Sequence, residues 1–151
     1  MKDDPIVREI TDSVLDRIKS EQMTLQLALA IIRRGEELAA SLGVPMVFTV
    51  VDEGGNMVAM HRMDHSLLAS IAVSGSKAYT AVALQCPTDE AAQTILPGQS
   101  LYGLQQTHPG RFCLFGGGVP IIRGGRCVGG LGASGGTVEQ DTAAARHAVS
   151  L

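Results

Sequence analysis

The chain has 151 residues, of which 45% are hydrophobic and only 3% are aromatic. A net charge of -3 supplies neither a phosphate-neutralising surface nor stacking platforms, so nucleic acid is not expected as a partner. No apolar run approaches the ~20 residues of a membrane span, the acidic first residues lack the apolar core of a signal peptide, and the three cysteines have no C-x-x-C spacing. We therefore predict a single cytoplasmic domain over residues 1–151, without a membrane partner.

Two amphipathic helices are predicted in the first third of the chain. A four-residue apolar repeat indicates a helix within residues 1–20, peripheral to the domain and formed around Ile6, Ile10, Val14 and Ile18. A second stripe predicts a more apolar helix over residues 24–42. This second helix is expected to cover a sheet.

β-branched and apolar runs predict five strands, at residues 46–51, 57–61, 112–115, 121–123 and 127–131. Further helices are expected at residues 66–84, 88–97 and 138–149. Because hairpins outnumber β-α-β units, we predict an α+β fold with an antiparallel five-stranded sheet between helices.

The helix predicted at residues 66–84 has two contrasting faces. One carries an apolar stripe expected to face the core, made of Leu68, Ile71, Gly75, Ala78, Tyr79 and Val82. The opposite side carries Ser66, Ser70, Ser74 and Lys77. These polar residues form either the solvated side of the helix or one wall of a polar pocket.

The glycine-rich turn Ser134-Gly135-Gly136 is the first candidate binding site. Thr137 and Gln140 have the spacing of a capping box, which places this turn at a helix N-terminus. Free N–H groups and the helix dipole favour an anion or a carbonyl oxygen there. The alternative is that these glycines only form turns.

Two catalytic motifs match in part. Residues 132–136 fit G-x-S-x-G, but Asp141 and His147 would lie on opposite faces of one helix and cannot form a relay to Ser134. Residues 74–77 fit S-x-x-K without the companion motifs of penicillin-recognising enzymes. The sequence therefore shows no complete catalytic set.

Charged residues after the first hairpin form a second candidate site. Arg62 and Lys77 would suit carboxylate or propionate groups. Asp64 could orient Arg62 or cap the helix that begins near Ser66.

Five blocks of the sequence resemble the GlcG/HbpS family, which includes the C-terminal domain of PduO, and in particular its small stand-alone OrfY-type members. They agree in order and spacing from about Thr24 onward, at residues 50–59, 62–64, 77–81, 116–120 and 129–141. The resemblance implies a profilin-like three-layer α/β/α fold and homo-oligomers. It also implies haem or another tetrapyrrole as the ligand in some members, with links to diol, glycerol or cobalamin-dependent metabolism.

Three functions remain open from the sequence. The favoured one is a small-ligand-binding protein for haem or a related tetrapyrrole, with His108 or His65 as a chemically possible axial ligand. A second is an enzyme acting on a small carbonyl or carboxylate compound, in which the Ser134 turn holds an oxyanion and Lys77 or Asp64 moves a proton. A third is an oligomeric accessory protein of a metabolic enzyme.

Overall fold

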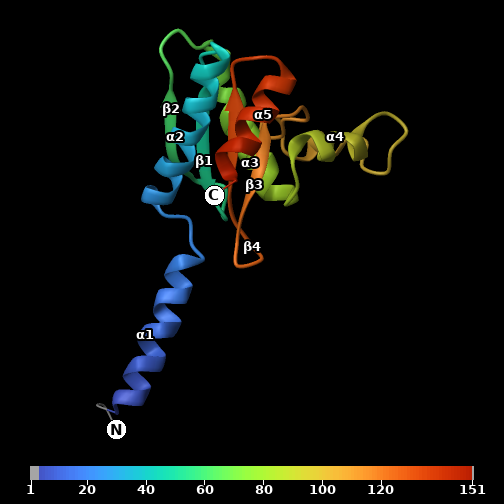
Figure 1. Cartoon of the computed structure of the whole chain (residues 1–151). Helices are drawn as coiled ribbons and strands as arrows, with labels where there is room; N and C mark the ends of the chain where they lie inside the picture. Colours follow the sequence, from blue (N-terminus) through green and yellow to red (C-terminus); the bar gives the residue numbers. More distant parts are fainter. Residues whose placement is uncertain (1–3, 151) are drawn as a thin grey trace.

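The computed structural model describes residues 4–150, which form helices around one antiparallel sheet (Figure 1). The helices and strands occur along the chain in nearly the predicted order. The elements are α1 (Pro5–Ser20), α2 (Leu25–Leu42), β1 (Val47–Asp52), β2 (Met57–Arg62), α3 (Ala69–Leu84), α4 (Thr88–Ile95), the 3-10 helix η1 (Leu104–Thr107), β3 (Gly118–Arg123), β4 (Arg126–Ser134) and α5 (Val138–Val149).

The sheet has four strands in the order β2-β1-β4-β3, and all neighbouring pairs are antiparallel. The prediction of a fifth strand at residues 112–115 was wrong. Backbone groups of this segment bind threonine side chains instead of a neighbouring strand. The Cys113 N–H donates to Thr80 Oγ1 at 2.8 Å, and the Phe115 carbonyl accepts from Thr88 Oγ1 at 2.9 Å. The apolar run indicated burial correctly, but burial does not require strand pairing.

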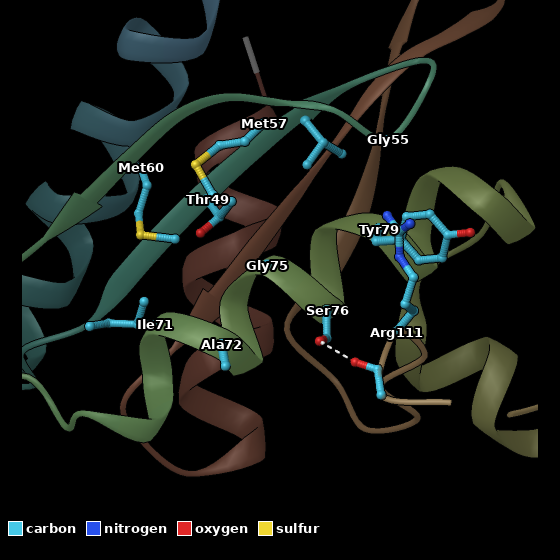
Figure 2. A pocket seen from close by; sticks show the side chains of 12 residues that line it. Thr49, Gly55, Met57, Met60, Ile71, Ala72, Gly75, Ser76, Tyr79 and Arg111 are labelled. Atoms are coloured by element: carbon cyan, nitrogen blue, oxygen red, sulfur yellow. Dashed lines mark hydrogen bonds between the residues drawn. The ribbon is translucent and has the colours of Figure 1, made fainter. Parts of the chain in front are cut away.

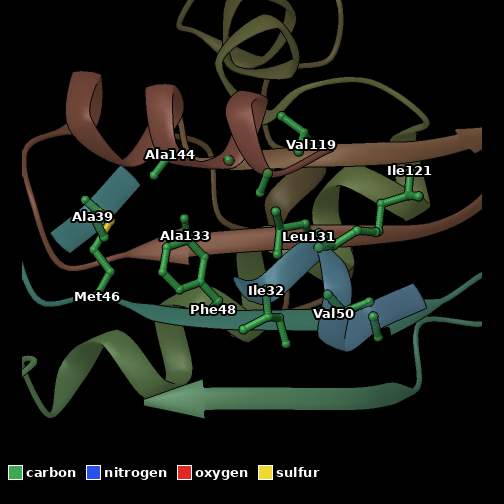
Figure 3. Close-up of a cluster of buried hydrophobic side chains, with 14 of the residues drawn as sticks. Ile32, Ala39, Met46, Phe48, Val50, Val119, Ile121, Leu131, Ala133 and Ala144 are labelled. Atoms are coloured by element: carbon green, nitrogen blue, oxygen red, sulfur yellow. The ribbon is translucent and has the colours of Figure 1, made fainter. Parts of the chain in front are cut away.

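Helices cover both faces of the sheet. The main core lies between the sheet and the helices α2 and α5, where Phe48 and Leu131 pack with Ile32 and Ala144 (Figure 3). On the opposite face, Val51 packs with Ala78 and Val82 of α3. The molecule therefore has helices on both sides of a mixed α+β architecture.

Helix α3 approaches β4 so closely that their backbones touch. A Cβ atom added at Gly132 would collide with the Ser74 carbonyl oxygen, and one at Gly130 with the Ala78 carbonyl oxygen. No side chain fits at these two positions, which explains why glycine occupies them.

This close packing turns α3 relative to the predicted orientation. Ser70, Ser74 and Lys77, predicted on the solvated or pocket side, are buried against the sheet. Leu68, predicted to face the core, is 81% exposed. The prediction was therefore wrong for Leu68, although Ala78 and Val82 are buried as expected. Backbone proximity, rather than side-chain hydrophobicity, selects the inner face of α3.

Helix α1 extends away from the rest of the molecule at the N-terminal end (Figure 1). A short connection, residues 21–24, joins it to α2. In the described residues, no helix is both long enough and apolar enough to cross a membrane.

Candidate functional site

The Ser134-Gly135-Gly136 turn connects the end of β4 to the start of α5, as the sequence predicted. Thr137 and Gln140 form the expected capping box. The Gly136 N–H donates to Asp141 Oδ1 at 2.8 Å. The Ser134 hydroxyl donates to the Ser70 hydroxyl at 3.2 Å and is buried. A carboxylate from the chain itself thus binds an amide predicted to hold an anion.

Lys77 lies beside this turn and is fully buried. Its Nζ donates to Asp141 Oδ2 at 2.7 Å and to the Ala133 carbonyl oxygen at 2.9 Å. The ammonium also lies 4.9 Å from the centre of the Phe115 ring. The structure therefore brings Lys77 and the turn together, but Asp141 joins them and side chains fill the space between.

Arg62 and Asp64 are exposed at the end of β2 and in the connection that follows. Asp64 does not cap α3, because that helix begins at Ala69 and its N-cap, Leu68, makes no side-chain capping bond. Asp64 instead borders a shallow depression beside Arg33 and Glu36 of α2. It is thereby on the opposite face of the sheet from Lys77.

His108 and His65 are both exposed. The His108 ring meets the Phe112 ring edge-on, with centroids 5.2 Å apart, and its Nδ1 lies 2.9 Å from Thr107 Oγ1. His65 has a φ of 67°, a left-handed backbone conformation. Within residues 4–150, no three His, Cys, Asp or Glu side chains cluster closely enough to hold a metal ion.

An open groove lies between α3 and the β1–β2 hairpin (Figure 2). Its volume is about 370 Å³, within the range typical of small-molecule sites. Carbon and sulfur atoms form most of the lining, which consists of Thr49, Val51, Gly55, Met57, Met60, Ile71, Ala72, Gly75, Ser76, Tyr79, Gly110 and Arg111. We call this cavity the α3 groove.

One cation lies at the α3 groove. The Arg111 guanidinium stacks on the Tyr79 ring, with its central carbon 3.9 Å from the ring centroid (Figure 2). The Ser76 hydroxyl donates to the Gly110 carbonyl oxygen at 3.4 Å, which ties the Arg111 loop to α3. This loop also carries His108 and Phe112, whose rings neighbour Tyr79.

Sequence reasoning missed the α3 groove because Ile71, Gly75 and Tyr79 were assigned to the core. One signal was available. A glycine inside a helix costs about 1 kcal/mol relative to alanine, so it suggests a packing or functional reason. A Cβ atom at Gly75 would meet nothing within 4 Å, so packing does not require glycine there. Its missing side chain instead leaves the groove open.

Two of the three cysteines are poor candidates for a reactive nucleophile. Burial raises the pKa of the Cys113 thiol, and burial together with Glu90 and Asp89 raises the pKa of Cys86. Both thiols therefore stay protonated at neutral pH, whereas nucleophilic cysteines are thiolates.

A family model described as "Haem degrading protein HbpS-like" matches residues 23–150. The chain belongs to the GlcG/HbpS family. It is 46% identical over 134 residues to an uncharacterised 15.0 kDa protein of Citrobacter freundii, covering 87% of this chain and 94% of that protein. It is also 42% identical to the corrinoid adenosyltransferase PduO of the same organism. That match covers 83% of this chain but only 36% of PduO.

Solved structures of GlcG/HbpS relatives share the fold. The Klebsiella pneumoniae protein ORFY superimposes with a TM-score of 0.82 at 42% identity, covering 85% of this chain and 89% of ORFY. A complex of PduOC with haem superimposes with a TM-score of 0.81 at 38% identity, covering 85% of this chain and 93% of PduOC. At least one relative of this fold thus binds haem.

Proposed function

We propose that this protein binds haem or a related tetrapyrrole in the α3 groove. The observation that best supports this proposal is the apolar lining of the groove next to Arg111, the one cationic side chain among the lining residues. A tetrapyrrole presents a broad apolar ring with acidic side groups, and such a molecule would place its ring between α3 and the β1–β2 hairpin. Its carboxylates would then lie near Arg111.

The residues of the α3 groove fit such a ligand. Met57 and Met60 contribute thioethers to the lining, and His108 lies on the loop that carries Arg111. Thioether sulfur and imidazole nitrogen are both side-chain ligands of haem iron. Haem would bring redox-active iron into the groove, while the chain's own groups orient the ring and neutralise its acids.

Because Lys77 is buried in its pair with Asp141, Arg111 is a better candidate for the carboxylate-binding role that was predicted for Arg62 and Lys77. The same pair disfavours the alternative of an enzyme that uses the Ser134 turn as an oxyanion hole. There, Asp141 already accepts from Gly136, and Lys77 is sealed from solvent.

Substitution of Gly75 by leucine tests the proposal directly. Because a Cβ at Gly75 would meet open space, Gly75→Leu fills the α3 groove without disturbing the core. We expect hemin to produce a Soret shift with the wild-type protein and none with Gly75→Leu, although the variant should be at least as stable to heat as the wild type. An equal shift in both would reject this site. Ala40→Leu, on an exposed position of α2, is the matched control.

Further titrations separate the ligand classes. Iron-free protoporphyrin IX tests whether the ring alone suffices, and cobalamin tests a corrinoid ligand, because the relative PduO is a corrinoid adenosyltransferase. Replacing His108, His65 or Met60 should change the Soret position only for the residue that coordinates iron. If none of the three changes it, the axial assignment fails while the groove assignment remains.

A further inference from the structure

Helix α1 exposes an apolar stripe that nothing in the described structure covers. Its six large apolar side chains are 45% to 65% exposed, and they are Ile6, Val7, Ile10, Val14, Leu15 and Ile18. The matching part of the family model begins at residue 23, so α1 lies outside it. The stripe therefore needs an explanation other than the family fold.

A lone helix of this size is marginal in water. With 16 residues, α1 only just exceeds the length of about 12 to 15 residues below which isolated helices are marginal even in alanine-rich sequences. It is also rich in β-branched residues, which lower helix propensity, and tertiary packing normally supplies the missing stability. Covering the stripe would stabilise both the helix and its exposed side chains.

The stripe is symmetric about its own centre. Ile6, Ile10, Val14 and Ile18 are spaced evenly around residue 12. In an antiparallel pair of such helices, Ile6 would meet the partner's Ile18, and Ile10 would meet the partner's Val14. A two-fold interface between identical chains requires this kind of self-complementarity.

The charges of α1 favour the same orientation. Its first half carries two carboxylates and one arginine, at Glu9, Asp12 and Arg8. Its second half contains Arg17 and Lys19 with one acid, Asp16, and Arg17 also pairs with Glu21 just after the helix at 3.2 Å. An antiparallel pair places the acidic half of each helix beside the basic half of the other, whereas a parallel pair would place the acidic halves together.

We propose that α1 pairs antiparallel with the α1 helix of a second copy of this chain. The helix is about 24 Å long, so the paired surface is smaller than a standard stable interface. The pairing should therefore be reversible and depend on protein concentration. The α3 groove is not part of this interface, so the inference stands independently of ligand binding.

A charge placed in the stripe tests the pairing. Val14→Glu puts a carboxylate at the centre of the stripe, whereas Ser13→Glu adds the same charge beside it. Both positions are exposed, so the body should fold in both variants. Sedimentation equilibrium of the full chain should show dimer dissociation about tenfold stronger for Val14→Glu than for wild type or Ser13→Glu. A wild-type monomer, or equal association in all three, would overturn the proposal.

Mixed cysteine variants test the orientation. In the antiparallel pair, Ile10→Cys of one chain faces Val14→Cys of the other, so a mixture of the two variants should form disulfide dimers faster than either variant alone. The wild-type chain, with its own three cysteines, provides the background rate. Faster cross-linking within each single variant would indicate parallel helices and overturn the antiparallel arrangement.

Discussion

The two sides of α3 differ. The inner side holds the site that the sequence predicted, and the outer side holds the cavity found in the structure. On the inner side, Lys77, Asp141 and the Ser134 turn form a closed polar network whose partners all come from the chain. On the outer side, the α3 groove is open and mostly apolar, and Arg111 is one of its lining residues. The sequence predicted a ligand site in the closed region because glycines and charged residues occur both in tightly packed regions and in ligand sites.

The largest expected effect comes from breaking the closed network. Lys77→Met would leave the buried Asp141 carboxylate without its cation, and we expect a loss of about 3 to 5 kcal/mol in the free energy of unfolding. Urea unfolding measures this. Adding Asp141→Leu should recover much of the loss, because an apolar pair needs no buried charge compensation. A single-variant loss below about 1 kcal/mol would contradict the network's structural role.

The same Gly→Ala change should have opposite effects on the two sides of α3. At Gly132 the added methyl collides with the Ser74 carbonyl oxygen, and we expect a loss of about 3 kcal/mol. At Gly75 the methyl enters open space on a helix, and we expect a gain of about 1 kcal/mol. Thermal and urea unfolding compare the two variants, and losses of equal size would refute the contrast.

Removing the cation of the α3 groove should weaken ligand binding without affecting folding. For Arg111→Gln we expect hemin affinity to fall about tenfold, because one charge-assisted contact to a carboxylate is lost. Raising the salt concentration should narrow the difference between variant and wild type. Arg33→Gln, on α2, is the matched control and should bind hemin as wild type does. Equal losses in both would exclude a specific role for Arg111.

The smallest effect is expected at Ser134. Ser134→Ala removes one hydrogen bond to the buried Ser70 hydroxyl, so we expect a loss of about 1 kcal/mol in unfolding free energy. Hemin binding in the α3 groove should be unchanged. A large loss of binding with little loss of stability would instead return the ligand site to the turn.

Local sequence signals predicted the elements well. The capping box at Thr137 and Gln140, the short helix that follows Pro87 and the turn-rich strand boundaries all depend on neighbouring residues, so they can be recognised without a fold. The predicted strand at residues 112–115 failed because threonine hydroxyls of α3 and α4 bind its backbone, and such partners are distant in the sequence.

The candidate site was harder to predict for a related reason. The inner face of α3 depends on glycines some 55 residues away in β4, as in the contact of Ser74 with Gly132. Hydrophobic periodicity cannot reveal that a strand with glycine at the positions facing α3 selects serine and lysine as its partners. The family resemblance supplied the fold, but neither it nor the motifs indicated which concavity stays open.

The backbone contact between α3 and β4 also determines which parts of the α3 groove can change shape when a ligand binds. The wall formed by α3 is held in place. The helix cannot move toward the sheet, because its carbonyl oxygens already touch the glycines of β4, and it cannot easily move away, because Lys77 is bound to the buried Asp141. The opposite wall contains Met57 and Met60 of β2, whose flexible side chains can change shape at low cost. Discrimination between ligands of different size should therefore reside in this methionine wall, and variation at Met57 and Met60 should alter ligand choice while the architecture stays unchanged.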